Sequence, residues 1–379
     1  MNIEPAYDVL IIGGGLAGLA LSIQLSNAGK KVLVLEKDQY PRHKVCGEYI
    51  SFESKPFLER IGLAISLMKL PEINTLQVSD TKGRVLKAKL PQGGFGISRY
   101  KLDATLATIA EQSGVNLLCN TKADDIIFEK GVFTVKAGDR MYTAKVVCGA
   151  WGKRGNLDNK LLRDFAVEKK QGLNNFVGVK YHIKYSWPEH LIALHNFRNG
   201  YCGISRVEDD RCCLCYLTNA ANLQESGNDI KQMELEILMK NPHLKKIFAH
   251  ADFLYEHPLT ISQISFRKKG LVQGHILMLG DSAGMISPLC GNGMSMAFHS
   301  SLIAFDAIQD FLEEKVSRAQ MEDAYTKRWN KQFASRIGMG RFIQSRFGKE
   351  WQTSLFLNSM KLFPFLQKPM IKATAGKEF

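Results

Sequence analysis

Proline is scarce in this sequence, with 11 among 379 residues, and charged residues make up 23% of it. Disordered, fibrous and collagen-like chains need long polar tracts or abundant proline, so this composition excludes those classes. Hydrophobic residues account for 45% and supply a sizeable core. The length suits two or three domains, or one large α/β unit with an inserted subdomain. We therefore expect a globular protein.

The eight cysteines follow no recognisable secretory leader, so a disulfide framework is not expected. Cys212 and Cys215 form one C-x-x-C pair, but no second pair of Cys or His follows it. A structural zinc ion needs four ligands, which a lone pair does not supply. The apolar neighbours Leu214 and Tyr216 indicate a buried strand instead. We predict no metal site.

One segment, from Val9 to Gly29, contains no charged residue and is about long enough to span a bilayer. However, the glycines at 13–15 interrupt the apolar run after only four residues, and acids rather than basic residues precede it. A strand at 9–12, a glycine turn, a helix at 16–28 and a second strand at 32–35 explain the pattern better. The segment therefore predicts a βαβ unit.

The turn of this unit has the spacing of a dinucleotide-binding site. Gly13, Gly15 and Gly18 form G-x-G-x-x-G between strand and helix, and Glu36 follows the second strand at 36 − 13 = 23 positions from the first glycine. The glycines allow a tight turn, close approach of a pyrophosphate and close helix packing, in that order. The helix N-terminus offers free N–H groups to phosphates. Glu36 can accept both hydroxyls of an adenosine ribose and disfavours a 2′-phosphate.

A second site with glycines and an acid appears much later in the chain. A carboxylate at the carboxyl end of a strand faces the crevice where open α/β sheets bind ligands, which is the role we expect for Asp281. Two such separated sites would close on one extended ligand. The later site has four parts, namely a buried strand, an acid, a glycine turn and a helix: Ile276–Leu279, Gly280–Asp281, Pro288–Gly293 and Met294–Phe311.

With these motifs the chain resembles the flavoprotein superfamily of geranylgeranyl reductases and aromatic hydroxylases, which share the FAD fold of glutathione reductase. The resemblance spans residues 6 to about 310 and depends on the order and spacing of four blocks. The block from 41 to 48 is similar to the P-x-x-x-x-C-G motif of the reductase branch. The blocks are Gly13–Gly18 with Glu36, Pro41–Glu48, Arg99 with Leu102 and Asp103 at a helix start, and Gly280–Gly293.

The resemblance implies an α/β fold: a glutathione reductase-type, Rossmann-like FAD-binding domain, an inserted α+β substrate domain and a helical C-terminal segment. Alternating stretches at 176–183, 191–197 and 211–217 indicate a sheet in the insertion. Such a layered arrangement favours a largely apolar ligand site between domains. The expected limits are 1–75, 98–155 and 270–330 for the FAD-binding domain, 76–97 and 156–269 for the substrate domain, and 331–379 for the C-terminal segment.

The resemblance also implies which residues bind FAD. Glu36 would hold the AMP ribose, Arg99 would lie over the cofactor, and the backbone around Ala123 would meet the adenine. Asp281 would accept hydrogen bonds from the ribityl hydroxyls, with a helix N-cap as the simpler alternative. The full set of expected cofactor-binding residues is Gly13, Gly15, Ala17, Gly18, Glu36, Cys46, Gly47, Arg99, Ala123, Asp281, Pro288, Gly291, Gly293 and Met294.

Two residues next to the flavin by this resemblance, Cys46 and Glu48, are the candidate catalytic residues. Cys46 would contact or tune the isoalloxazine, or it is a small buried filler, since free cysteines are often buried. Glu48 would be a proton donor or base if burial raises its pKa, or it forms a surface ion pair with a neighbouring Arg or Lys. The sequence leaves both alternatives open for both residues.

The implied function is that of an FAD-dependent oxidoreductase resembling geranylgeranyl reductases, which transfers a hydride from flavin N5 to an apolar isoprenoid, lipid-like or polyketide-derived substrate. One alternative is a monooxygenase that hydroxylates an aromatic or lipid-like substrate through C4a-hydroperoxyflavin. Another is a flavin-binding protein without catalysis. FAD is the expected cofactor, with NAD(P)H or another donor as the source of electrons.

Three departures from the family patterns bear on this choice. Trp151 stands where the hydroxylase branch has the aspartate of an Asp-Gly motif, which places docking of NAD(P)H at that position in doubt. The segment Tyr201–Ser205 lacks the Y-x-W-x-F-P pattern of the reductase branch. The W-x-W-x-I-P motif of halogenases is also absent.

Positive charge is concentrated in the last 44 residues, which have eight basic and two acidic side chains, or +6 of the total +13. Aromatic residues are interleaved with this charge, so the tail resembles amphipathic helical pieces. We expect either packing against the substrate domain or peripheral contact with a membrane. No nucleic-acid motif accompanies the charge, so nucleic acid is not an expected partner. The expected location is cytoplasmic, with membrane association if the tail makes that contact.

Overall fold

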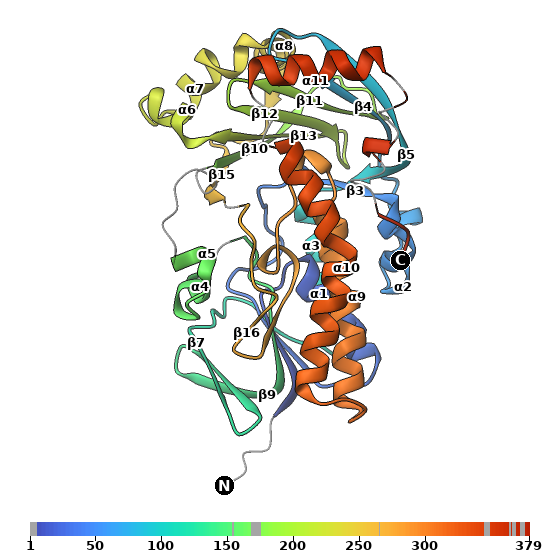
Figure 1. Cartoon of the computed structure of the whole chain (residues 1–379), viewed down its shortest axis with the longest axis vertical. Helices are drawn as coiled ribbons and strands as arrows, with labels where there is room; N and C mark the ends of the chain where they lie inside the picture. The colour runs from blue at the N-terminus through green and yellow to red at the C-terminus, as the bar shows by residue number, and fades with distance from the viewer. Residues whose placement is uncertain are drawn as a thin grey trace.

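The computed structural model describes residues 6–153, 155–167, 176–264, 266–344, 349–363, 365, 369–371 and 376–379. Two sheets lie one above the other in Figure 1, and long helices run along the lower sheet. This is the α/β class predicted from the sequence. The lower part carries the two glycine turns, and the upper part is built mainly from residues between them.

The lower sheet has the parallel core expected of a dinucleotide-binding fold. Its order is β16–β17–β9–β1–β2–β6, and every pair from β17 to β6 is parallel. Both faces of a parallel sheet are covered, which explains why its strands are continuous apolar runs. The three predicted strands are confirmed. The strands are β1 (Tyr7–Ile12), β2 (Val32–Leu35), β6 (Asn116–Leu118), β7 (Asp125–Glu129), β8 (Val132–Ala137), β9 (Arg140–Gly149), β16 (Val272–Gln273) and β17 (Ile276–Met278).

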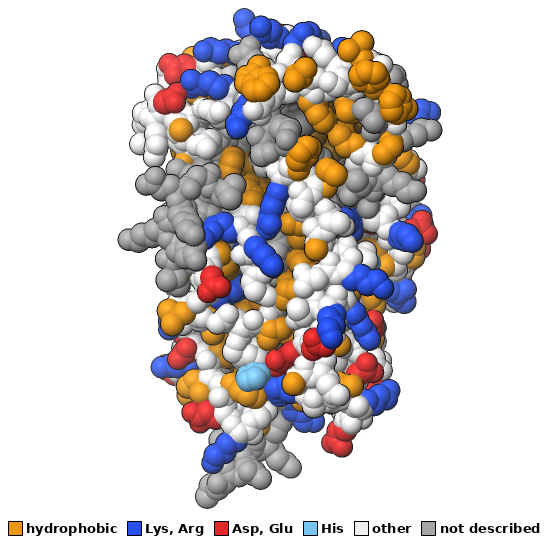
Figure 2. Space-filling view, viewed as in Figure 1, with side chains coloured by type: hydrophobic (Ala, Val, Ile, Leu, Met, Phe, Trp, Pro, Cys, Tyr) orange, Lys and Arg blue, Asp and Glu red, His pale blue; other side chains and the backbone are white. Residues whose placement is uncertain are grey.

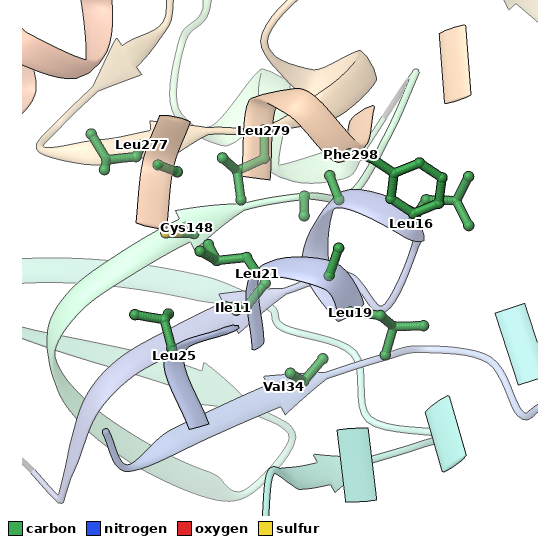
Figure 3. Close-up of a cluster of buried hydrophobic side chains, with 14 of the residues drawn as sticks. Ile11, Leu16, Leu19, Leu21, Leu25, Val34, Cys148, Leu277, Leu279 and Phe298 are labelled. Carbon is green, nitrogen blue, oxygen red and sulfur yellow. The ribbon is translucent and has the colours of Figure 1, made fainter. Parts of the chain in front are cut away.

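Helices on the lower sheet share one apolar core. Figure 3 shows Leu19 and Leu21 of the first helix in the same buried cluster as Ile11 and Phe298. Burying each such side chain contributes about 1.5–3 kcal/mol. This core holds α1 against both α3 and α9, and α10 packs on α9. The helices are α1 (Leu16–Asn27), α2 (Lys55–Arg60), α3 (Arg99–Gln112), α4 (Asn156–Lys160), α5 (Asp164–Val167), α9 (Gly293–Leu312) and α10 (Arg318–Gln344).

The upper sheet has the order β14–β10–β13–β12–β11–β4–β5–β3, with β15 also paired to β10. All its pairs are antiparallel except β4 with β11. The three stretches predicted as strands are β10, β11 and β13. Its elements are β3 (Tyr49–Ser51), β4 (Glu72–Ser79), β5 (Val85–Gly96), β10 (Phe176–Lys184), β11 (Leu191–Phe197), β12 (Gly200–Arg206), β13 (Cys212–Asn219), β14 (Asp252–Phe253), β15 (Leu259–Ile264), α6 (Ala220–Glu225), α7 (Ile230–Glu236) and α8 (Pro242–His250).

The expected domain limits stay predictions. The limit at residue 75 falls inside β4, and the limit at 330 falls inside α10. Both elements continue across these positions without a break. Strand β3, at 49–51, also belongs to the upper sheet although it lies within the range expected for FAD binding.

The upper sheet has two distinct faces, because successive side chains of a strand point in opposite directions. On the back face, Tyr181 and Tyr216 pack with Met233 of α7 and Leu244 of α8. On the front face, Lys180 lies opposite Cys215 and His182 lies opposite Cys213 in the β10–β13 register. The front face therefore carries polar and sulfur groups at positions that directly neighbour the lower part of the molecule.

The C-terminal segment is helical, as predicted, and contacts both parts of the molecule. Helix α11 (Glu350–Leu362) buries Leu357 in a cluster with Leu194 and Leu217 of the upper sheet. The Phe379 ring stacks on His299 of α9, with centroids 4.1 Å apart. Within the ranges described above, none of the helices combines the length and apolar character needed to cross a membrane.

Candidate cofactor site

The first glycine turn has the geometry that its spacing predicts. Gly13 has a φ of +109°, and a Cβ there would lie 2.5 Å from the carbonyl oxygen of Ala150. A Cβ on Gly18 would overlap the carbonyl oxygen of Gly13. Gly15 instead faces open space, with no atom within 4 Å of an added Cβ. The outer glycines are thus required by packing, and the middle one leaves room for a ligand to approach the backbone.

The two glycine turns lie side by side. A Cβ on Gly280 would be 3.2 Å from the Cβ of Ala17 and 3.6 Å from that of Ala297. Gly15 begins α1 and Asn292 begins α9, and neither helix has a side-chain cap at its N-terminus. Uncapped N–H groups and the positive ends of two helix dipoles therefore meet at one place. This arrangement favours an anion, such as the pyrophosphate of a dinucleotide.

A small cavity lies next to Asp281. The cavity measures about 10 Å³, which holds about one water molecule. Trp329 of α10 lines it together with Asp281, and its indole N–H has no hydrogen-bond partner among the described residues. The Lys269 ammonium donates to the backbone carbonyl of Asp281 at 2.7 Å and fixes the position of this turn. Burial lowers the pKa of Lys269 to about 8.

Glu36 ends β2 in a buried position and already has several partners. Its carboxylate accepts from the backbone N–H of Gly14 at 2.7 Å and from that of Asp38 at 3.0 Å, and it pairs with Arg42 at 2.6 Å. Burial alone would raise the pKa of Glu36, but Arg42 outweighs this effect and lowers it. The sequence predicted a ribose as the partner and did not identify Arg42. The buried Ala123 follows a turn in which the Thr121 N–H donates to the Glu36 carbonyl at 2.8 Å.

The block from 41 to 48 lies between the second glycine turn and the front face of the upper sheet. A Cβ on Gly291, which has a φ of +67°, would lie 3.1 Å from the Tyr49 ring. The half-buried Cys46 accepts at its carbonyl from the Cys213 thiol, with sulfur and oxygen 3.3 Å apart. Gly47 faces open space. The structure thus places Tyr49, the residue directly after this block, against Gly291 of the second glycine turn.

Glu48 is buried completely, and its role as a proton donor or base stays a prediction. Its φ of +55° is in the left-handed region, a strained conformation that costs a non-glycine residue about 1–3 kcal/mol. Its carboxylate accepts from the Arg99 N–H at 2.7 Å, is 2.5 Å from His182 Nε2, and forms an ion pair with Lys180. Burial would raise the pKa of Glu48, yet Lys180 and His182 lower it to about 2. The ion pair is therefore buried rather than at the surface, and the group is a carboxylate.

The carboxylate of Glu48, His182 and the thiol of Cys213 lie close enough together to suggest a metal site. However, one carboxylate oxygen already contacts Lys180 and the other contacts His182. A cation would compete with the ammonium and would have to separate the imidazole from the carboxylate. We therefore interpret this cluster as a hydrogen-bonded network.

The remaining predicted residues surround this network. The Arg99 guanidinium is held by both oxygens of Asp103, at 2.6 and 2.8 Å, at the start of α3. Gly293 is the first residue of α9, and a Cβ added to it would have its nearest neighbouring atom 3.9 Å away. The next residue, Met294, is buried. Pro288 is exposed and begins a short 3-10 turn. Pro288 thus belongs to the second glycine turn, where its carbonyl accepts from the Gly291 N–H at 3.0 Å.

Trp151 occupies the position at which the hydroxylase branch has the aspartate of an Asp-Gly motif. The Trp151 ring packs closely over Gly149, and a Cβ added to Gly149 would lie 2.5 Å from that ring. The Trp151 indole N–H donates to the Asp158 carboxylate at 3.0 Å. Asp158 also binds the buried Arg163 at 2.8 Å, and Arg163 donates to the carbonyl of Ser282. Trp151 is therefore part of a network that supports the second glycine turn.

Sequence analysis did not identify Lys180, His182, Tyr255 or His43 as site residues. The signal was present for two of them, because Lys180 and His182 alternate with apolar residues along a strand that is otherwise hydrophobic. Tyr255 lies outside any motif, and His43 occupies a variable position of the block from 41 to 48. Tyr255 reaches His182 Nδ1 at 2.7 Å from a loop after β14, a contact that depends on tertiary packing.

Apolar side chains continue the front face beyond the polar cluster. Figure 1 shows α11 lying across the upper sheet, and its residues contribute to this apolar region. The cluster joins three parts of the molecule, which are the upper sheet, the segment that precedes α9, and helix α11. Its buried members are Val78, Leu194, Tyr201, Leu217, Ile264, Phe266, Met285 and Leu357.

The sequence matches the family described as FAD binding domain over residues 6–336. Conditioned medium factor receptor 1 of Dictyostelium discoideum is 25% identical over 371 residues, which are 90% of this chain and 71% of that protein. Digeranylgeranylglycerophospholipid reductase 1 of Methanococcoides burtonii is 23% identical over 368 residues, which are 91% of this chain and 84% of that protein. The solved structure of a flavin-dependent brominase is similar to this chain with a TM-score of 0.79 at 19% sequence identity. The match covers 97% of this chain and 93% of the brominase chain, and it shows a similarity of fold.

Proposed function

Because this chain belongs to the FAD binding domain family and takes FAD as its cofactor, we propose that it reduces a double bond in an apolar, isoprenoid or lipid-like substrate. The archaeal relative supports this substrate class, since its name describes a reductase of a geranylgeranyl lipid. When bound, the flavin would supply the hydride. The observation that carries the proposal is the front face of the upper sheet, where an apolar cluster adjoins the Glu48–Lys180–His182 network.

Residues of this chain would hold the cofactor at three places. The uncapped N-termini of α1 and α9 would bind the pyrophosphate. Asp281 and the unpaired indole N–H of Trp329 would bind polar groups of the ribityl chain or its ordered water. The open positions at Gly15, Gly47 and Gly293 would leave space for the ligand.

The reductase proposal is tested with the FAD-loaded protein, reduced without oxygen and mixed with digeranylgeranylglycerophospholipid or menaquinone. We expect faster flavin reoxidation with one of these lipids and a product that has gained two hydrogens, seen by mass spectrometry. Substrate-linked oxygen uptake with a hydroxylated product would favour the monooxygenase alternative. The absence of any lipid-dependent reoxidation would favour a flavin-binding role without catalysis.

Asp281→Ala tests the placement of the cofactor. We expect this variant to lose bound FAD on purification, because it removes the acid of the second glycine turn. The matched control is Asp306→Ala, on the distal part of α9, which should keep its FAD. Retention of stoichiometric FAD by Asp281→Ala would remove Asp281 from the binding site.

We also propose that α11 contacts a membrane surface. Trp351, Leu355 and Leu362 lie along one stripe of the helix and are 69%, 58% and 75% exposed, while Thr353 and Leu357 on the other side are buried. Hydrophobic side chains gather at the top of the molecule in Figure 2, over the region of α11 in Figure 1. An apolar stripe with basic residues nearby, as at Lys349 and Lys361, is typical of helices that lie in a membrane interface.

Vesicle flotation tests this contact. We expect the protein to float with vesicles containing phosphatidylglycerol and to float less with neutral ones. Serine substitutions at Trp351, Leu355 and Leu362 should reduce flotation, whereas the control Leu67→Ser, at a side chain 81% exposed elsewhere, should not. Equal flotation of the two variants would exclude α11 as the contact.

A further inference from the structure

A continuous chain of side-chain contacts leads from Glu48 to the outer surface. Glu48 Oε2 lies 2.5 Å from His182 Nε2, and His182 Nδ1 lies 2.7 Å from the Tyr255 hydroxyl. That hydroxyl lies 3.0 Å from His43 Nε2. The first two side chains are fully buried, Tyr255 and His43 are half-buried, and His43 stacks on the exposed ring of Tyr100.

The direction of the hydrogen bonds follows from the charge on Glu48. A carboxylate has no proton to donate, so His182 Nε2 must carry the proton of that bond. In a neutral imidazole the other nitrogen then accepts, which means that the Tyr255 hydroxyl donates to Nδ1. The Tyr255 oxygen remains free to accept from an N–H of His43. All three bonds therefore point inward, from the surface to Glu48.

The surroundings of the path keep it in this state. Lys180 is positively charged and contacts the second oxygen of Glu48, so the carboxylate stays ionised. Burial, together with the charge of Lys180, lowers the pKa of His43 to about 4, which leaves the ring neutral near pH 7. Burial also raises the pKa of Tyr255 to about 12, so its hydroxyl keeps its proton. His43, Tyr255 and His182 can thus each both donate and accept, and Glu48 accepts.

We propose that Glu48, His182, Tyr255 and His43 form a proton path that supplies the proton needed to complete reduction of the substrate double bond. The inference rests on the proposed function, because adding a hydride to one carbon requires a proton at the other. One proton enters at His43, and His43 passes an N–H proton to the Tyr255 oxygen as Tyr255 passes its own proton to His182 Nδ1. His182 passes its Nε2 proton to Glu48. The O–H bond formed on Glu48 is then broken as the new C–H bond forms, so no electrons move along the path.

The inner end of the path is next to the cofactor block. Glu48 follows Gly47, which faces open space, and accepts from the backbone of Arg99 at the start of α3. The left-handed backbone of Glu48 stores strain in this position, which is frequent where a residue is held for a function. Three polar contacts to one fully buried carboxylate are more than a stable core needs, since apolar residues fill such space at least as well.

The state of His182 can be tested without a substrate. Nitrogen-15 labelling of histidine in the FAD-loaded protein, read by NMR at pH 7, should show a neutral ring with its proton on Nε2. Glu48→Gln should change that signal, because an amide can donate as well as accept. A cationic ring, or a proton on Nδ1 in the unmodified protein, would overturn the inward direction of the path.

The path is also tested by the rate of lipid reduction, measured with reduced, FAD-loaded protein and digeranylgeranylglycerophospholipid. Loss of a general acid–base contribution lowers a rate by roughly 10²–10⁴-fold, and we expect losses of that order for Tyr255→Phe and His182→Gln with unchanged FAD content. His43→Ala should be partly rescued by free imidazole, since His43 is at the outer end. His195→Gln and Tyr216→Phe are controls, because these buried residues lie on the back face of the same sheet.

The outcomes separate the two proposals. If the unmodified protein reduces lipid and Tyr255→Phe does so at the same rate, the path is wrong and the proposed function stands. If the unmodified protein reduces neither test lipid, that activity fails, and the NMR result alone decides whether the path exists.

Discussion

Two buried carboxylates, Glu48 and Glu234, bind to opposite faces of β10 and behave in opposite ways. On the back face Glu234 accepts from the hydroxyls of Tyr181 and Tyr216, at 2.9 and 2.7 Å. On the front face Glu48 contacts Lys180 and His182, the residues on either side of Tyr181. Burial raises the pKa of Glu234, whereas the pKa of Glu48 falls to about 2 despite the same effect of burial.

The difference shows how one strand can serve structure and chemistry at once. Neutral hydroxyls stabilise a buried carboxylate less than burial destabilises it, while an ammonium group at contact distance reverses the balance. Glu234 therefore resembles a core hydrogen-bonding group. Glu48 remains charged beside the cofactor block, where a fixed charge can orient hydrogen bonds.

Removing the charge of Lys180 should have the largest effect on stability among the substitutions around Glu48 and Glu234. Lys180→Met leaves Glu48 without its ammonium partner, and breaking a buried ion pair in this way costs about 3–5 kcal/mol. The free energy of unfolding in urea measures this loss. Glu234→Gln is the matched control on the back face, with an expected cost near 1 kcal/mol for changed hydrogen bonds. Equal losses for the two variants would show that the sheet faces do not differ.

Glu48 and Glu234 should contribute to the dependence of folding stability on pH with opposite signs. The folded pKa of Glu48 is lowered, so its contribution is present above the unfolded value near 4.5 and is lost as the pH falls toward 2. The folded pKa of Glu234 is raised, so its effect has the opposite sign, and stability falls as the pH rises above 4.5. Unfolding curves of Glu48→Gln and Glu234→Gln across acid pH, compared with the unmodified protein, measure both slopes. A shared sign would contradict the comparison.

A smaller effect is expected when one neutral donor is removed. Tyr181→Phe leaves Glu234 with the Tyr216 hydroxyl and should cost about 1 kcal/mol, the value of a typical hydrogen bond. FAD content should not change, because Tyr181 is on the back face. Thermal unfolding with and without FAD measures both quantities, and a loss of bound FAD in this variant would show that the two faces are coupled.

Much of the nucleotide-binding half could be predicted from local pattern. The glycine spacing at 13–18 predicts a turn between strand and helix because each glycine meets a steric demand that is nearly independent of the rest of the chain. The strands at 9–12 and 32–35 were predicted for the same reason. Asp281 was expected to face the ligand crevice because its position after a strand follows a general rule of α/β folds.

The partners of the acids could not be predicted in this way. Arg42, six residues from Glu36, is an ion-pair partner only because the intervening chain turns back. Lys180 and His182 reach Glu48 from 132 and 134 positions away. The pKa of Glu48 is lowered rather than raised because these neighbours outweigh the effect of burial.

By itself the sequence determined the α/β class and the two glycine turns, since these depend on short-range sterics and on the periodicity of apolar residues, and its resemblance to a flavoprotein family implied FAD as the cofactor. Only the tertiary structure decided which charges surround Glu48 and which side of β10 faces the cofactor block. The physical reason is that electrostatic interactions in a buried site depend on distances of a few ångströms between distant segments, and those distances are fixed when the whole core is packed.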